Sequence, residues 1–152
     1  LQKIRDAGIH FEYLPIAEDT MFNRFFWSVT EKAGIIGSKH GCYFLPPKRK
    51  DSLSATSDKS NLPAQIIHTV LKAAIEFEKK NVTTDKKLIR IVNIFINSYI
   101  YDKMEILTDE WCKQFAKTEY IDFLERLLVP NPQWVKENTL TFIDRVVECF
   151  DR

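Results

Sequence analysis

Apolar residues at helical spacing run through most of the chain and predict an all-α protein. Residues 62–80 carry apolar side chains three and four positions apart, with Asn61 as a cap and Pro63 in the first turn. Residues 86–101 follow Asp85 and leave little polar surface, which predicts a central helix packed on more than one side. A buried strand is the alternative for a run so rich in β-branched residues, and the length of the run favours the helix.

The last third of the chain repeats the pattern. Thr108 is placed to cap a short helix, and Thr118 either begins a new helix or lies within a continuous one that Pro130 stops. The pair Asn131-Pro132 predicts the start of the final helix, which runs to about residue 150. Helices joined by such short turns pack as antiparallel neighbours.

The first third contains two helical patterns, residues 1–7 ending at Gly8 and residues 20–33 ending at Gly34. Because the first pattern is already helical at Leu1, we expect the chain to be a fragment of a longer helical protein. Residues 46–61 are rich in Pro, Lys, Ser and Asp, which predicts a flexible polar and basic insertion. Residues 1–152 are thus expected to form a single domain, an antiparallel helical bundle or an irregular, solenoid-like helical repeat with one long polar loop.

Composition narrows the class of function. The 152 residues carry a formal net charge of +1, whereas nucleic-acid binders usually have a clear basic excess. No apolar run reaches the roughly 18 residues that a membrane-spanning helix needs, so no membrane partner is expected. Three widely spaced cysteines fit a reducing compartment. We expect an intracellular protein, cytoplasmic or nuclear, with Lys48-Arg49-Lys50 as a short basic element of the kind that directs nuclear import.

The opening segment resembles the junction between two pentatricopeptide-type repeats. The matching residues are Lys3-Ile4-Arg5-Asp6-Ala7-Gly8-Ile9, then Thr20-Met21-Phe22-Asn23, then Glu31-Lys32-Ala33-Gly34. The resemblance covers residues 1–34 only, and the rest of the chain is similar to armadillo or HEAT-like helical repeats. It implies a helix-hairpin repeat, in which Asn23 would occupy the position of a base-reading side chain.

Catalytic and metal-binding patterns are not found in the sequence. His10, His40 and His68 lack partners at the spacing of metal ligands, and no cofactor motif occurs. Cys112 and Cys149 fall on apolar helical faces, where a thiol packs in the core more often than it reacts. We therefore expect a protein that is not an enzyme and that holds neither metal nor cofactor.

The favoured function is a non-catalytic helical-repeat scaffold that binds a helix or peptide of a protein partner, or neighbouring repeats of its own parent chain, in a groove. Aromatic side chains would anchor that partner, and the candidates are Phe26, Trp27, Trp111 and Trp134. The alternative is an RNA-binding helical repeat. Its candidate contacts are Asn23, Arg24, Lys48, Arg49 and Lys50.

Overall fold

The computed structural model describes residues 2–14, 16–30, 61–100, 105 and 107–151. Every regular element in these ranges is helical, which confirms the predicted all-α class. The α-helices are α1 (Gln2–Ala7), α2 (Glu18–Val29), α4 (Leu62–Lys80), α5 (Asp85–Ile100), α6 (Asp109–Lys113), α7 (Thr118–Leu127) and α8 (Glu137–Asp151), with a 3-10 helix η2 (Pro132–Trp134) before α8. The predicted insertion at 46–61 lies outside the described residues except for Asn61.

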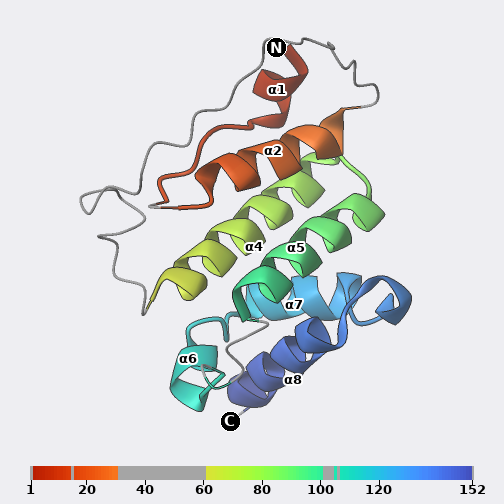
Figure 1. The fold of residues 1–152 in the computed structure, drawn as a ribbon. Helices are drawn as coiled ribbons and strands as arrows, with labels where there is room; N and C mark the ends of the chain where they lie inside the picture. Colours follow the sequence, from red (N-terminus) through yellow and green to blue (C-terminus); the bar gives the residue numbers. More distant parts are fainter. Residues whose placement is uncertain (1, 15, 31–60, 101–104, 106, 152) are drawn as a thin grey trace, which may run out of the picture.

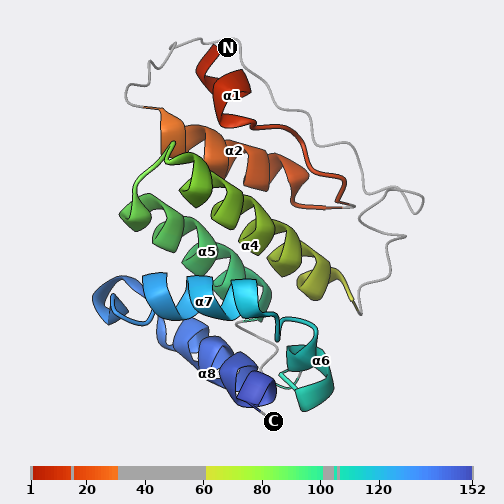
Figure 2. The ribbon, with the colours of Figure 1, turned by 180° about the vertical axis from the view of Figure 1, so that it is seen from behind.

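Apart from α6, the helices are stacked in chain order, from α1 at the N-terminal end to α8 at the C-terminal end (Figures 1 and 2). Helices α2, α4 and α5 lie side by side with roughly aligned axes, irrespective of chain direction, while α7 and α8 form the C-terminal end with α6 beside them. Helix α5 contacts α4, α8, α2 and η2. The predicted central helix, packed on more than one side, is therefore confirmed.

Several helix ends follow from local chemistry. Helix α1 ends at Gly8, whose φ of 71° is in the left-handed region that glycine adopts without strain. Helix α4 ends at Asn81 in the same region, and the Asn81 N–H donates to carbonyls of the last turn. The Thr108 hydroxyl accepts from the Trp111 N–H at 3.2 Å, which confirms the predicted cap of α6. Asn61, by contrast, makes no side-chain cap hydrogen bond, so only Pro63 of the predicted start signal is used.

Two boundaries differ from the sequence prediction, and at a third the structure has one of the two alternatives left open there, a new helix at Thr118. Helix α2 begins at Glu18 and ends at Val29, since Thr30 is extended, whereas the pattern predicted 20–33. Residues 108–128 form two helices, because Lys117 takes an extended conformation between them. Proline 132 starts only the short η2, and the extended Val135 separates it from α8. Thr30 and Val135 are extended at positions where the apolar spacing alone would continue a helix.

The core is continuous from α2 to α8 and is dominated by aliphatic and aromatic side chains. At its C-terminal end Phe142 packs edge-on against Phe115, with ring centroids 5.5 Å apart, and both are fully buried. A buried polar network joins α5 to α8. The side-chain amide oxygen of Asn93 (Oδ1) accepts from the Thr139 hydroxyl at 2.8 Å and from the backbone N–H of Lys136 at 2.9 Å. Asn97 donates to the Thr139 oxygen at 3.0 Å, so this network fixes α8 on α5.

Candidate functional site

A groove of about 220 Å³ lies between α2 and α5. Its lining residues come from both helices and are Arg24, Trp27, Ser28, Lys87, Arg90, Ile91 and Ile94. We call this the α2–α5 groove. Arg24 and Trp27 are three positions apart on α2, while Lys87, Arg90 and Ile94 follow one face of α5. The helical period therefore places the cations and the apolar side chains on one surface.

Hydrogen bonds to the last turn of α2 hold the groove closed at one end. The Ser28 carbonyl oxygen accepts from Lys87 Nζ at 2.7 Å and from Thr83 Oγ1 at 3.0 Å. Both donors satisfy a carbonyl that the helix itself leaves unpaired, and the ammonium complements the negative end of the helix dipole. The end of α2 is thus fixed against the beginning of α5.

The two arginines of the groove have no ion pair among the described residues. Arg24 and Arg90 are exposed, and no described acidic residue lines the groove between them. Acidic residues lie instead at the first turn of α2, where Glu18 and Asp19 contribute, after burial, to the raised pKa of Tyr99. The positive charge of the groove is therefore confined to the half near the start of α5.

An aromatic ridge continues from the groove along α2. The Trp27 and Phe26 rings meet edge to face at 5.4 Å, Phe26 and Phe22 lie 6.4 Å apart in parallel planes, and Phe22 stacks on Phe11 at 4.3 Å. Trp27 is 51% exposed and Phe11 is 59% exposed. The two ends of the ridge, Phe11 and Trp27, consequently present apolar area to the surroundings.

The predicted partner-binding residues are not gathered in one place. Trp27 lies in the groove, and Phe26 is half-buried beside it. Trp134 is 41% exposed on η2, where Lys86 Nζ lies 5.1 Å from its ring centroid. Trp111 is only 8% exposed and packs against Phe115 and Phe142, so its prediction as a surface anchor is wrong.

Of the predicted RNA contacts, Asn23 and Arg24 are exposed on α2, and Arg24 lines the groove. Lys48, Arg49 and Lys50 lie outside the described residues. The sequence did not single out Lys87 and Arg90 as site residues, because their partners on α2 are about sixty positions away. Their spacing with Ile91 and Ile94 on one edge of α5 is the signal that could have found them.

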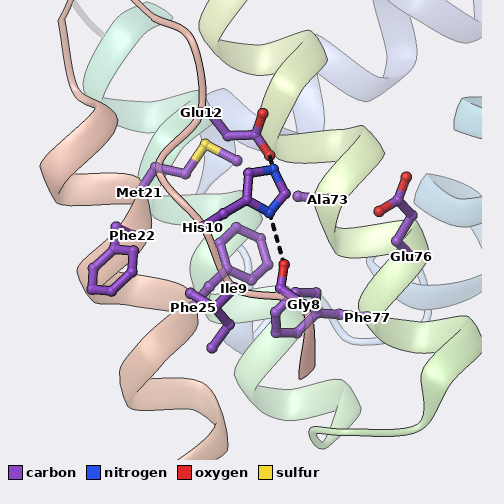
Figure 3. Close-up of a pocket in the computed structure, with 10 residues that line it drawn as sticks. All are labelled: Gly8, Ile9, His10, Glu12, Met21, Phe22, Phe25, Ala73, Glu76 and Phe77. Carbon is purple, nitrogen blue, oxygen red and sulfur yellow. Dashed lines mark hydrogen bonds and ion pairs between the residues drawn. The ribbon is translucent and has the colours of Figure 1, made fainter. Parts of the chain in front are cut away.

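A second, polar cleft runs along α4 between the loop after α1 and α7. Its upper part is a cavity of about 20 Å³, enough for one water, in which His10 bridges the Gly8 carbonyl at 2.8 Å and Glu12 at 3.0 Å (Figure 3). Its lower part, of about 250 Å³, contains His68, whose Nδ1 is 3.3 Å from the Tyr120 hydroxyl. The His68–Tyr120 contact joins α4 to α7, whereas both His10 contacts lie within the loop after α1.

Two titratable side chains of that cleft, His68 and Tyr120, are shifted toward their uncharged forms. Burial, aided by Lys117, lowers the pKa of His68, and burial raises the pKa of Tyr120. At neutral pH both groups are therefore uncharged hydrogen-bonding partners. Ionised tyrosine would be needed for attack, and burial works against it.

The two described cysteines pack in the core as predicted. Cys112 is fully buried, and burial raises its thiol pKa to about 11, with the neighbouring Cys149 as the next cause. A thiol with such a pKa is protonated at neutral pH and a poor nucleophile. Across the described ranges no cluster of three His, Cys, Asp or Glu side chains could hold a metal ion. Nor is any described helix long and apolar enough to cross a membrane.

Comparison of the chain with protein-family models, with curated proteins and with solved structures finds no match. The α2–α5 groove and its surroundings are therefore the features of the described residues that bear on function.

Proposed function

We propose that this helical domain is a non-catalytic interaction module that binds a segment of a protein partner in the α2–α5 groove. The observation that carries the proposal is the exposed Trp27, set between aliphatic side chains and two arginines that have no ion pair in the described residues. Tryptophan and arginine are the residues that contribute most to protein interfaces when a partner covers them.

The groove has the dimensions for one or two side chains of a partner peptide rather than for a small metabolite. Its 220 Å³ are open on one side, and its apolar floor is formed by Ile91 and Ile94. The aromatic ridge of Phe11, Phe22, Phe26 and Trp27 would extend the contact beyond the groove. A peptide or helix that lies along α2 would cover both.

RNA binding is the second candidate, and two observations make it less favourable. Phe22 presents a ring face to Phe11, so that face is not free for a base to stack on. Glu18 and Asp19 at the start of α2 would repel a phosphate backbone that continued along the groove. Phosphate binding would therefore be limited to the end near Arg90.

The proposal is tested by selecting a displayed library of random 12-residue peptides on the purified protein. We expect enriched peptides whose binding is lost on Trp27→Ala and kept on Trp134→Ala, which removes an exposed tryptophan outside the groove. Circular dichroism would show that both variants are folded. Failure to enrich any peptide, or enrichment of peptides insensitive to Trp27→Ala, would contradict the proposal.

A further inference from the structure

The charges around the α2–α5 groove indicate which kind of partner segment it would bind. Three cations, Arg24, Lys87 and Arg90, line a surface with an apolar floor and no described acidic residue. Lys87 is already bound to the Ser28 carbonyl, so the two arginines are the groups left to pair with a ligand. Arginine forms two parallel hydrogen bonds with a carboxylate, which favours this anion in both geometry and charge.

Resting on the proposed function, we infer that the partner segment is acidic: an apolar side chain fits between Trp27 and Ile94, and a carboxylate on either side of it pairs with Arg24 and Arg90. The two arginines belong to different helices, one on each wall of the groove. An extended or helical peptide that crosses from α2 to α5 would meet both. A basic or neutral segment would leave both guanidinium groups without a partner in a partly desolvated site, which opposes its binding.

Two acidic residues at the start of α2 limit the length of this contact. Glu18 and Asp19 begin α2, at the end of the helix that faces Tyr99, whereas Ser28 at its other end faces Thr83 and Lys87. Helices α2 and α5 are therefore antiparallel, and the surface between them changes from positive to negative along its length. A short acidic motif matches that surface better than a long polyanion such as RNA.

The composition of the peptides selected on the wild-type protein tests this inference separately from the proposed function. We expect enrichment of peptides with Asp or Glu on both sides of an aliphatic or aromatic residue. Peptides that lose binding on Trp27→Ala but are neutral or basic would overturn the acidic motif and leave the proposed function standing.

Charge reversal makes the test sharper. A synthetic peptide of the selected sequence should bind the R24E/R90E protein at least about tenfold more weakly than the wild type, and selection on that protein should enrich Lys and Arg instead. The K72E/K113E protein has the same net charge, but neither change lies in the groove, so it should keep the wild-type affinity. The neutral R24Q/R90Q variant provides a second measurement if charge reversal impairs folding.

Two results would contradict the inference. An equal loss of peptide affinity in R24E/R90E and K72E/K113E would mean that the peptide is attracted only by the electrostatic field of the whole protein. Displacement of the peptide by a 12-nucleotide oligouridylate at lower concentration than by the free peptide would mean that the groove prefers RNA.

Discussion

The two sides of helix α5 both carry polar side chains, but these side chains differ in what they contact. On the side of α8, Asn93 and Asn97 are 7% and 6% exposed and bond to Thr139 and to the Lys136 backbone. On the side of α2, Arg90 is exposed and has no ion pair among the described residues. Polar groups with partners inside the chain stabilise the fold, whereas cations left beside exposed apolar area are available to a ligand.

The largest expected effect is on the α8 side, where Phe142 is fully buried. Phe142→Ala should lower the free energy of unfolding by about 3–5 kcal/mol, because a fully buried ring in contact with Phe115 is lost and leaves a cavity. Phe150→Ala on the same helix is the matched control, since Phe150 is 42% exposed, and it should change stability by less than about 1 kcal/mol. Urea denaturation monitored by circular dichroism measures both. Similar losses of unfolding free energy in the two variants would mean that Phe142 does not lie in the core.

The buried polar network gives the next largest effect. Asn93→Ala should cost about 2 kcal/mol, because it removes the acceptor of the Lys136 N–H and the Thr139 hydroxyl. Asn23→Ala removes the same side chain from the exposed face of α2 and should cost less than about 0.5 kcal/mol. If both changes were equally harmless, the network would not hold α8 on α5.

The smallest expected effect concerns the polar cleft along α4 and appears only on acidification. The pKa of His68 is lowered in the folded state relative to its ordinary value of 6.5, chiefly by burial. Its contribution to stability is therefore complete above about pH 6.5 and is lost as the pH falls through the lower pKa of the folded state. Glu78, whose pKa is lowered by Arg126, loses its contribution in the same direction but below about pH 4.5.

Melting temperatures between pH 7.5 and pH 5 measure this effect. The wild type should lose stability over this range, and His68→Gln should lose less of it, because glutamine does not titrate. His10→Gln on the exposed loop should leave the loss in place. If His68→Gln showed the same pH dependence as the wild type, the loss of stability on acidification could not be assigned to His68.

Much of the fold could be predicted from the sequence, because helix spacing is a local property. The Gly8 and Thr108 boundaries, the central position of α5 and the burial of Cys112 all follow from neighbouring residues. The break at Val135 could not be predicted in this way. The extended Val135 precedes Lys136, whose N–H bonds to Asn93, forty-three positions earlier in the chain, so tertiary contacts help to set the beginning of α8.

The candidate site was predictable only in part, because it too depends on contacts between residues that are distant in the sequence. Trp27 and Arg24 could be selected from their place on α2, but the groove also needs Lys87 and Arg90 from α5. Trp111 and Trp27 are the same residue type on helical segments, and only packing separates the buried ring from the exposed one. A single sequence shows which residues share a helix face, not which face meets another.

The central claim, that the α2–α5 groove is the binding surface, is tested most directly by nuclear magnetic resonance of the three tryptophan indoles. Each indole N–H gives one signal, which is assigned by single substitution. Titration with the selected acidic peptide should shift the signal of Trp27, in the groove, and leave that of the buried Trp111 unchanged. A shift of the Trp134 signal with none at Trp27 would place binding elsewhere and contradict the account.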